Sequence, residues 1–320
     1  MASAAVVVGA GVTGLTTAIA LAESGVDVKV IADELPEATT SAAAGAMWGP
    51  YLVEPRRKVH GWSLRTLSEL RTLALRPGTG VEVLPGIEAS RTTGAAPAWS
   101  DMLDDLRPCA PGELPTGFAS GWRYSAPLID MPTYLGYLTT RLTATGTQLE
   151  VGHVTSLRAL AADWPVVVNC TGCGAHDLVP DPTMQPIRGQ LVVTTNPGVT
   201  EFFTENTGPS PDLCHIYPHG DTLVLGGTAE PGRWDLEADA GTADLIFTRC
   251  SAIDPRLADA TVIGHRVGLR PTTPAVQLRS ERLDSGTLII HNYGHGGAGI
   301  TLSWGCAADV ADRVAKVTLD

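Results

Sequence analysis

Long apolar runs and basic residues are both scarce in this chain of 320 residues. No apolar run approaches the roughly 18 residues that a helix needs to cross a bilayer. Lysine and arginine total 22 against 34 acidic residues, which gives a formal net charge of -12. This excess of negative charge repels a phosphate backbone and disfavours an anionic membrane surface. Nucleic acids and membranes are therefore not expected as partners.

Cysteine is sparse too, with six residues scattered along the chain. Such use in a long chain indicates reduced thiols and favours a cytoplasmic location. The missing basic leader and the missing Ser-Lys-Leu ending agree with that location. Cys170 and Cys173 have the spacing of a redox motif, but they directly follow the apolar stretch 166–168, so we interpret them as the end of a buried strand. A zinc site would need a second such pair, so no metal site is expected.

The first 33 residues have the pattern of a dinucleotide-binding βαβ unit. A short apolar strand leads into Gly9-Ala10-Gly11-Val12-Thr13-Gly14, and a helix follows. Gly9 permits the tight turn, Gly11 lets backbone approach a pyrophosphate, and Gly14 allows close helix–strand packing. Asp33, 19 residues after Gly14, can accept hydrogen bonds from ribose hydroxyls. FAD and NAD use the same device, so this segment leaves the choice between them open.

The remaining chain predicts an α/β fold with a discontinuous cofactor domain. Hydrophobic residues are 44% and charged residues 18%, which predicts a sizeable core. Short buried strands and a closing helix place 1–51, 150–185 and 265–320 in a Rossmann-like domain with a parallel sheet. Strand-like runs and helical stretches place 52–149 and 186–264 in an inserted α+β substrate domain with an antiparallel sheet.

Several segments resemble the D-amino-acid oxidase family. These are the stretch 39–48, the strand end at 168–172, the loop 268–274 with its Leu-Arg-Pro sequence, and the C-terminal pattern at 291–299 and 304–307. The resemblance runs in order through most of the chain and is weaker in the middle. It implies a flavoprotein fold of the glutathione-reductase type, with FAD as the cofactor and an inserted sheet above the flavin.

The same resemblance assigns the residues that contact FAD. Gly296 and Gly297 would bring bare backbone close to the isoalloxazine ring. Backbone N–H groups from Gly299 to Thr301 would stabilise charge on the reduced flavin. Together with Gly9, Gly11, Val12, Thr13, Gly14 and Asp33, the expected cofactor contacts are Thr39, Thr40, Ser41, Gly45, Met47, Val154, Thr171, Gly172, Gly296, Gly297, Gly299, Ile300 and Thr301.

Arg270 is the residue expected to bind the substrate, because a guanidinium can hold an α-carboxylate with two parallel hydrogen bonds. The carbonyl of Gly297 is the expected acceptor for the substrate amine. The family usually has a carboxylate-binding tyrosine where this chain has His215, and often another where it has Pro211. Tyr217 lies on the same strand face as His215. The contact is therefore left open between His215 and Tyr217, with simple packing as the other interpretation.

These features predict an oxidase that transfers hydride from the Cα of mainly neutral D-amino acids to flavin N5 and reduces O₂ to H₂O₂. No second arginine is clearly placed for a side-chain carboxylate, although Arg266 and Arg279 leave a D-aspartate preference open. The alternatives are a flavoprotein dehydrogenase, a glycine or sarcosine oxidase, and a non-enzymatic flavin-binding protein. His295 is interpreted as packing at the flavin edge rather than as a base. The oligomeric state is open, a homodimer included.

Overall fold

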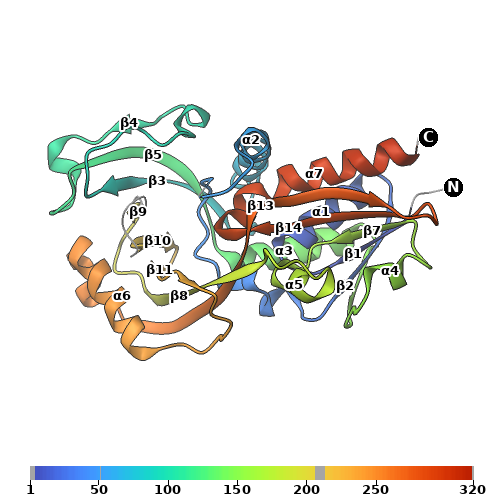
Figure 1. The fold of residues 1–320 in the computed structure, drawn as a ribbon. Coiled ribbons are helices and arrows are strands. Elements are labelled where there is room, and N and C mark those ends of the chain that lie inside the picture. The colour runs from blue at the N-terminus through green and yellow to red at the C-terminus, as the bar shows by residue number, and fades with distance from the viewer. Residues whose placement is uncertain (1–3, 51, 206–212, 319–320) are drawn as a thin grey trace.

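The computed structural model describes residues 4–50, 52–205 and 213–318. One half of the molecule is a parallel sheet with helices on both faces (Figure 1). The predicted βαβ unit is present, with α1 (Val12–Glu23) between the first two strands. The strand order is β14 (Leu288–His295), β7 (Val166–Asn169), β1 (Ala4–Val8), β2 (Asp27–Ala32) and β6 (Gln148–Val151).

Alternate residues of β1 enter two separate cores, as expected for a strand buried on both faces. Ala5 and Val7 face the core that includes α1 and α7 (Gly299–Thr318). Val6 and Val8 pack against Leu157, the first residue of α4 (Leu157–Leu160). The sheet is therefore covered on both sides, and its strand ends are the places left for a ligand.

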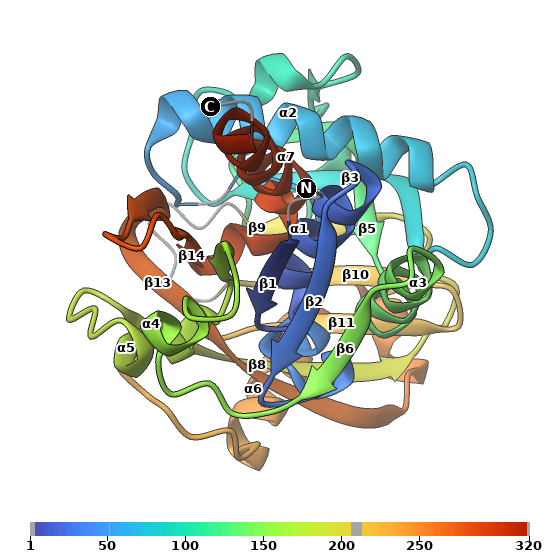
Figure 2. The same ribbon diagram turned by 90° about the vertical axis from the view of Figure 1, so that its right-hand side faces the viewer.

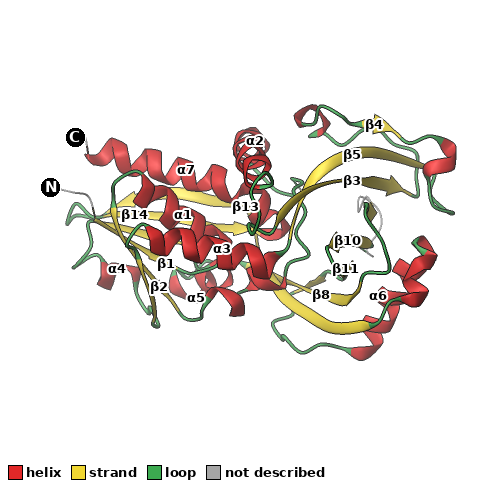
Figure 3. Ribbon diagram, turned by 180° about the vertical axis from the view of Figure 1, so that it is seen from behind, coloured by secondary structure: helices red, strands yellow, loops and turns green. Residues whose placement is uncertain are grey.

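The other half of the molecule is a strongly curved sheet, seen from behind in Figure 3. It is antiparallel apart from the parallel pair β3–β9. The helix α6 (Ala240–Ile253) packs on its outer face through the apolar cluster around Ile246. In spatial order its strands are β4 (Arg107–Pro108), β5 (Ser120–Ile129), β3 (Val81–Ser90), β9 (Phe202–Glu205), β10 (His215–His219), β11 (Thr222–Gly226) and β8 (Gln185–Thr195), with β12 (Glu230–Pro231) paired to β8.

A single long strand, β13 (Val262–Arg282), joins the two halves into one sheet. Its first part pairs with β8, and its last part pairs with β14. The predicted α/β class, with a parallel cofactor sheet and an antiparallel substrate sheet, is confirmed. The proposed domain limit at residue 265 falls inside β13, so the two sheets are continuous there. The domain limits themselves stay a prediction.

Two helices from the predicted substrate segment 52–149 pack on the cofactor half (Figure 2). Gly305 of α7 lies against α2 (Arg56–Leu73) so closely that a Cβ there would be 2.2 Å from the Trp62 carbonyl oxygen. The Trp304 indole donates a 2.8 Å hydrogen bond to the hydroxyl of Tyr134 in α3 (Met131–Ala144). The remaining short helices are α5 (Ala175–Leu178) and the 3₁₀ turns Pro36–Ala38, Thr40–Ala43, Ser100–Met102, Pro111–Glu113, Gly172–Gly174, Pro255–Asp259 and Gly296–Ala298.

Within the described residues, no helix is both long and apolar enough to cross a bilayer.

Candidate active site

A cavity of about 1100 Å³ lies between the ends of the parallel strands and the inner face of the curved sheet. Almost all of the predicted site residues line it, although they come from segments far apart in the sequence. Gly14 and Thr301 do not line it. The predicted residues on its wall are Gly9, Gly11, Val12, Thr13, Asp33, Thr39, Thr40, Ser41, Gly45, Met47, Val154, Thr171, Gly172, His215, Tyr217, Arg270, Gly296, Gly297, Gly299 and Ile300.

The glycine turn after β1 has the conformation that a dinucleotide site requires. Gly9 has a φ of +109°, and a Cβ there would lie 2.4 Å from the Cys170 carbonyl oxygen. A Cβ on Gly14 would lie 1.9 Å from the Gly9 carbonyl oxygen, so Gly14 serves helix–strand packing, as the sequence predicts. The first turn of α1 has no acidic side chain, and the N–H of Val12, its first residue, donates to the Ser41 hydroxyl at 3.0 Å. Its positive end therefore faces the cavity and suits an anion.

Asp33 marks the end of the cavity beyond this turn. It follows β2, and its carboxylate lies 2.9 Å from Nδ1 of His153, a residue that the sequence analysis did not select. His153 and Val154 follow β6 and line the same wall. A hydroxyl-bearing ligand would meet both a carboxylate and an imidazole here.

A second helix, α7, also begins at the cavity. The 3₁₀ turn Gly296–Ala298 leads directly into it at Gly299, so the positive end of a 20-residue helix faces the cavity. Thr301 lies just behind this wall and is 2% exposed. Its hydroxyl donates to the Gly49 carbonyl and accepts from the Gly49 N–H, at 3.0 and 3.1 Å. Thr301 thus fixes the helix start, and its backbone contact with a flavin stays a prediction.

Arg270 enters the cavity from β13 and lies flat on β8. A Cβ on Gly189 would lie 2.5–2.7 Å from the guanidinium atoms, so only glycine leaves room for them. One terminal nitrogen of Arg270 donates a 3.0 Å hydrogen bond to the Thr228 carbonyl. This contact orients the fork, as a bidentate grip on a carboxylate requires.

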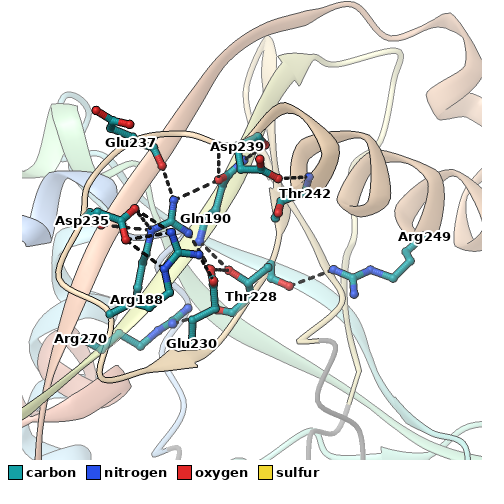
Figure 4. Close-up of polar contacts among 12 residues, drawn as sticks. Arg188, Gln190, Thr228, Glu230, Asp235, Glu237, Asp239, Thr242, Arg249 and Arg270 are labelled. Carbon is teal, nitrogen blue, oxygen red and sulfur yellow. Dashed lines mark hydrogen bonds and ion pairs between the residues drawn. The ribbon is translucent and has the colours of Figure 1, made fainter.

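The segment that carries Thr228 is held by a buried arginine network (Figure 4). Arg188 is fully buried and donates to the Glu230 carboxylate at 2.6 Å and to the backbone carbonyl of Asp235 at 3.1 Å. The Thr228 hydroxyl accepts from the Gln190 N–H at 3.0 Å. These contacts fix the loop after β11 against β8. Because Arg270 donates to the Thr228 carbonyl in this loop, they also fix the position of the Arg270 guanidinium.

His215 and Tyr217 lie on the same face of β10, as the sequence predicts. Nδ1 of His215 is 2.9 Å from the Leu213 carbonyl oxygen, so it must carry the proton. Burial, reinforced by the nearby Arg270 charge, lowers the pKa of His215 to about 4. The ring is therefore neutral at physiological pH, with a bare Nε2 that is buried without a hydrogen-bond partner among the described residues. Pro211, the other family tyrosine position, lies outside the described residues.

The chemical roles of His295 and of the C-x-x-C cysteines can be judged from their burial. His295 lines the cavity, and burial lowers its pKa to about 4, so it is neutral near pH 7. The cysteines of the C-x-x-C pair are free thiols, and burial raises the pKa of each to about 12. A thiol with such a high pKa is a poor nucleophile at neutral pH. Arg266 and Arg279 are absent from the cavity lining among the described residues.

On the part of the wall that belongs to the curved sheet, the sequence analysis selected His215 and Tyr217 but missed their neighbours. Glu88 on β3, Trp99 and Thr204 on β9 line the cavity beside Tyr217. No sequence motif marks them. Glu88 faces Thr204 only because β3 pairs with β9, a parallel pairing between strands more than a hundred residues apart.

Comparison with known proteins identifies the family. A model of the family described as FAD dependent oxidoreductase matches residues 4–313. The chain belongs to this family. A D-amino-acid oxidase from Rubrobacter xylanophilus is 48% identical over 308 residues, which cover 96% of this chain and 94% of the relative. A D-amino-acid oxidase from Streptomyces coelicolor is 45% identical over 308 residues, covering 96% of this chain and 95% of the relative.

Solved structures of this fold agree. Glycine oxidase from Geobacillus kaustophilus superposes with a TM-score of 0.82 at 20% identity, covering 97% of this chain and 94% of that chain. At that identity the likeness shows the fold alone. The predicted family and its cofactor, FAD, are confirmed by the family match. The cavity fits this cofactor, since it offers two helix N-termini, an uncrowded glycine turn and Asp33 along one continuous wall.

Proposed function

We propose that this chain is an FAD-dependent D-amino-acid oxidase acting mainly on neutral D-amino acids. The observation that supports this most directly is that Arg270 and the Gly296–Gly299 turn line one cavity, on neighbouring strands that are paired at Thr272 and His295. The two relatives, both named D-amino-acid oxidase, point to the same activity. The net reaction turns a D-amino acid, O₂ and water into a 2-oxo acid, ammonia and H₂O₂. FAD, when bound, supplies the two-electron acceptor that takes the Cα hydride.

The chain's own residues would bind and orient the substrate. Arg270 holds the α-carboxylate with two N–H groups while a third contact keeps it on Thr228. The exposed Gly297 backbone offers a carbonyl to the substrate amine. Fixing both ends of the amino acid aims the Cα–H bond at one wall of the cavity. Such positioning is worth several kcal/mol of activation free energy.

No side chain near this wall needs to act as a base. Burial lowers the pKa of His215 and of His295 to about 4, so each imidazole is a weak base at physiological pH. An amine that binds unprotonated can lose hydride from Cα without proton transfer from carbon. The start of α7 supplies positive potential where negative charge develops.

The deciding experiment is an anaerobic absorbance titration of the purified protein. We expect a flavin spectrum that is bleached by D-alanine and unchanged by L-alanine, with H₂O₂ released when air is admitted. In the Arg270→Met variant, we expect retained flavin and a fall in kcat/KM for D-alanine of about a hundredfold or more, because a buried charge partner is lost. A protein without flavin, or one bleached equally by both enantiomers, would contradict the proposal. Slow reoxidation in air would instead favour a dehydrogenase. The cytoplasmic location stays a prediction, and the oligomeric state stays open.

A further inference from the structure

A carboxylate lies on the substrate-side wall of the cavity, away from the glycine turn. Glu88 is in β3, is only 8% exposed, and lines the cavity. In the sheet it is paired with Thr204 of β9, which is paired in turn with His215 of β10. Side chains at paired positions lie on the same sheet face. Glu88 therefore belongs to the same row as His215, two strands away.

The Glu88 carboxylate has no cationic partner among the described residues. It accepts one hydrogen bond, from the hydroxyl of the buried Tyr124 at 2.9 Å, and burial raises the pKa of the Glu88 carboxyl. Glu205 nearby differs, because Arg91 contacts it at 2.7 Å. A buried acid with only a phenol as partner is costly to ionise. A cation that enters the cavity would remove that cost.

The surroundings of Glu88 suit a cation in a second way. Trp99 also lines the cavity, and its ring meets the ring of Tyr124 edge to face at 5.5 Å. Tyr124 is buried behind the cavity lining, where it contacts both Trp99 and Glu88, so Trp99 supplies the aromatic surface on this side of the cavity. Ammonium and guanidinium groups are attracted to such ring faces as well as to carboxylates.

Among the described residues that line the cavity, Arg270 is the one lysine or arginine, and it lies elsewhere on the wall. Arg270 is on β13, where it rests on Gly189 of β8, and the row from His215 to Glu88 continues away from it. Arg266 and Arg279, the other candidates for holding a substrate carboxylate, do not line the cavity. A D-amino acid bound with its α-carboxylate on Arg270 and its side chain extended along this row would bring the end of that side chain to Glu88.

We infer that Glu88 is a specificity-determining residue that binds the cationic end of a long D-amino acid side chain, such as that of D-arginine or D-lysine. This inference rests on the proposed oxidase function. Small neutral D-amino acids stay the main substrates of the proposed function, and the inference concerns long side chains: among those of equal length, the positively charged one is preferred. Acidic side chains are disfavoured because they would place a second negative charge beside Glu88.

Matched substrates and variants test the inference. D-arginine is compared with D-citrulline, which has a neutral urea in place of the guanidinium, and D-lysine with D-norleucine. The variant Glu88→Gln keeps the size of the side chain and an acceptor for Tyr124 but removes the charge. Glu82→Gln is the control, because Glu82 is an exposed carboxylate on the same strand.

We expect kcat/KM of the unmodified enzyme to favour D-arginine over D-citrulline by about tenfold or more. In Glu88→Gln we expect kcat/KM for D-arginine to fall by at least about 30-fold, as when one partner of a buried charge pair is removed. The values for D-citrulline and D-norleucine should change by less than about threefold, a spread normal for a remote contact. Glu82→Gln should leave every ratio unchanged.

An equal loss for charged and neutral substrates in Glu88→Gln would overturn the inference, as would an unmodified enzyme that prefers D-citrulline or D-norleucine. If Glu88→Gln does not retain flavin, the ratios of the unmodified enzyme decide alone. Bleaching by D-norleucine tests the oxidase function separately. A protein bleached by D-norleucine without the charge preference loses only the Glu88 assignment, whereas a protein bleached by no D-amino acid loses the proposed function.

Discussion

The imidazole of His215 stacks on the phenol ring of Tyr217, with centroids 4.4 Å apart and 24° between the planes. The two stacked rings both line the cavity, and their polar atoms differ in whether they can donate a hydrogen bond to a ligand. His215 uses its only N–H on the Leu213 carbonyl, so it can accept but not donate a further hydrogen bond. The Tyr217 hydroxyl, whose pKa is raised by burial, stays protonated, and its hydrogen bond to Thr204 is long, at 3.5 Å, so its proton can turn to a substrate carboxylate.

Tyr217 should therefore be the stronger carboxylate contact of the pair. We expect Tyr217→Phe to lower kcat/KM for D-alanine by about 10-fold or more, since a hydrogen bond to a charged group is lost. His215→Asn, which keeps an amide donor for the Leu213 carbonyl, should lower it by less than about threefold, because no donor to the substrate is removed. Steady-state kinetics on flavin-saturated enzyme measures both. A larger loss in the His215 variant would assign the contact to His215.

Glu230 should act as a positioning residue for Arg270. It anchors the fully buried Arg188 and accepts a 3.4 Å hydrogen bond from Thr228, whose carbonyl holds Arg270. We expect Glu230→Gln to raise KM for D-alanine by roughly 5- to 20-fold, because a charged partner of a buried network is lost. The value of kcat should change little.

The matched control is Arg233→Gln. Arg233 also pairs with Glu230, but it is about half exposed, and surface pairs contribute little. Its KM for D-alanine should stay within about twofold of the unmodified enzyme. If the two substitutions changed KM equally, or if Glu230→Gln changed kcat alone, Glu230 would not be a positioning residue for Arg270.

Alanine substitutions of Gly11 and Gly14 in the nucleotide turn should have different effects, one on FAD binding and the other on stability. A Cβ on Gly14 would overlap the Gly9 carbonyl at 1.9 Å, so Gly14→Ala should lower the melting temperature by several degrees through overpacking. A Cβ on Gly11 would lie 3.1 Å from the Ser41 hydroxyl, and a small rotation of that side chain relieves the contact at the cost of one local hydrogen bond, from the Val12 N–H. Gly11→Ala should fold normally, but its Kd for FAD should rise about tenfold or more, because the methyl group occupies pyrophosphate space. Fluorescence titration of the apoprotein with FAD and thermal melts distinguish the two. Normal FAD affinity in Gly11→Ala would contradict the assigned turn.

Local patterns predicted the cofactor half of the molecule well. The conformations of the glycine turn, the short apolar strands and the Gly296–Gly299 cluster are each determined by a few neighbouring residues, so they can be recognised in the sequence. Arg270 could be selected because it lies in a recognisable Leu-Arg-Pro motif, although the structure places that motif within the strand β13 and not in the expected loop. The sequence also placed His215 and Tyr217 on one face from strand periodicity alone.

Contacts that depend on strand register were beyond sequence reasoning. Glu88 reaches the cavity only because β3 pairs with β9, and nothing near Glu88 indicates that partner. The continuity of β13 through both halves was also hidden, since the stretch 262–282 contains two prolines and two glycines that suggest a break. Edges and bulges tolerate such residues within a strand. The position of the proton on His215 follows from its contact with the Leu213 carbonyl, and no sequence motif indicates that contact.

Buried neutral histidines should make the fold sensitive to mild acid. Burial lowers the pKa of His215, His291 and His295 from about 6.5 to about 4 each. Between those values the unfolded chain takes up protons that the folded chain refuses, so stability is full above about pH 6.5 and falls as the pH drops toward 4. For each histidine the slope is about 1.4 kcal/mol per pH unit inside this window.

The variant His295→Gln removes one of these groups. It should flatten the fall of the free energy of unfolding between pH 6 and 4.5 by about that slope, even if its stability at pH 8 is lower. Urea unfolding at a series of pH values, with FAD at constant excess, measures the difference. The control His265→Gln, at an exposed position of β13, should keep the parent slope. A parallel pH dependence of His295→Gln and the parent would mean that His295 titrates normally in the folded protein, and the neutral imidazole assigned to the cavity wall would then be wrong.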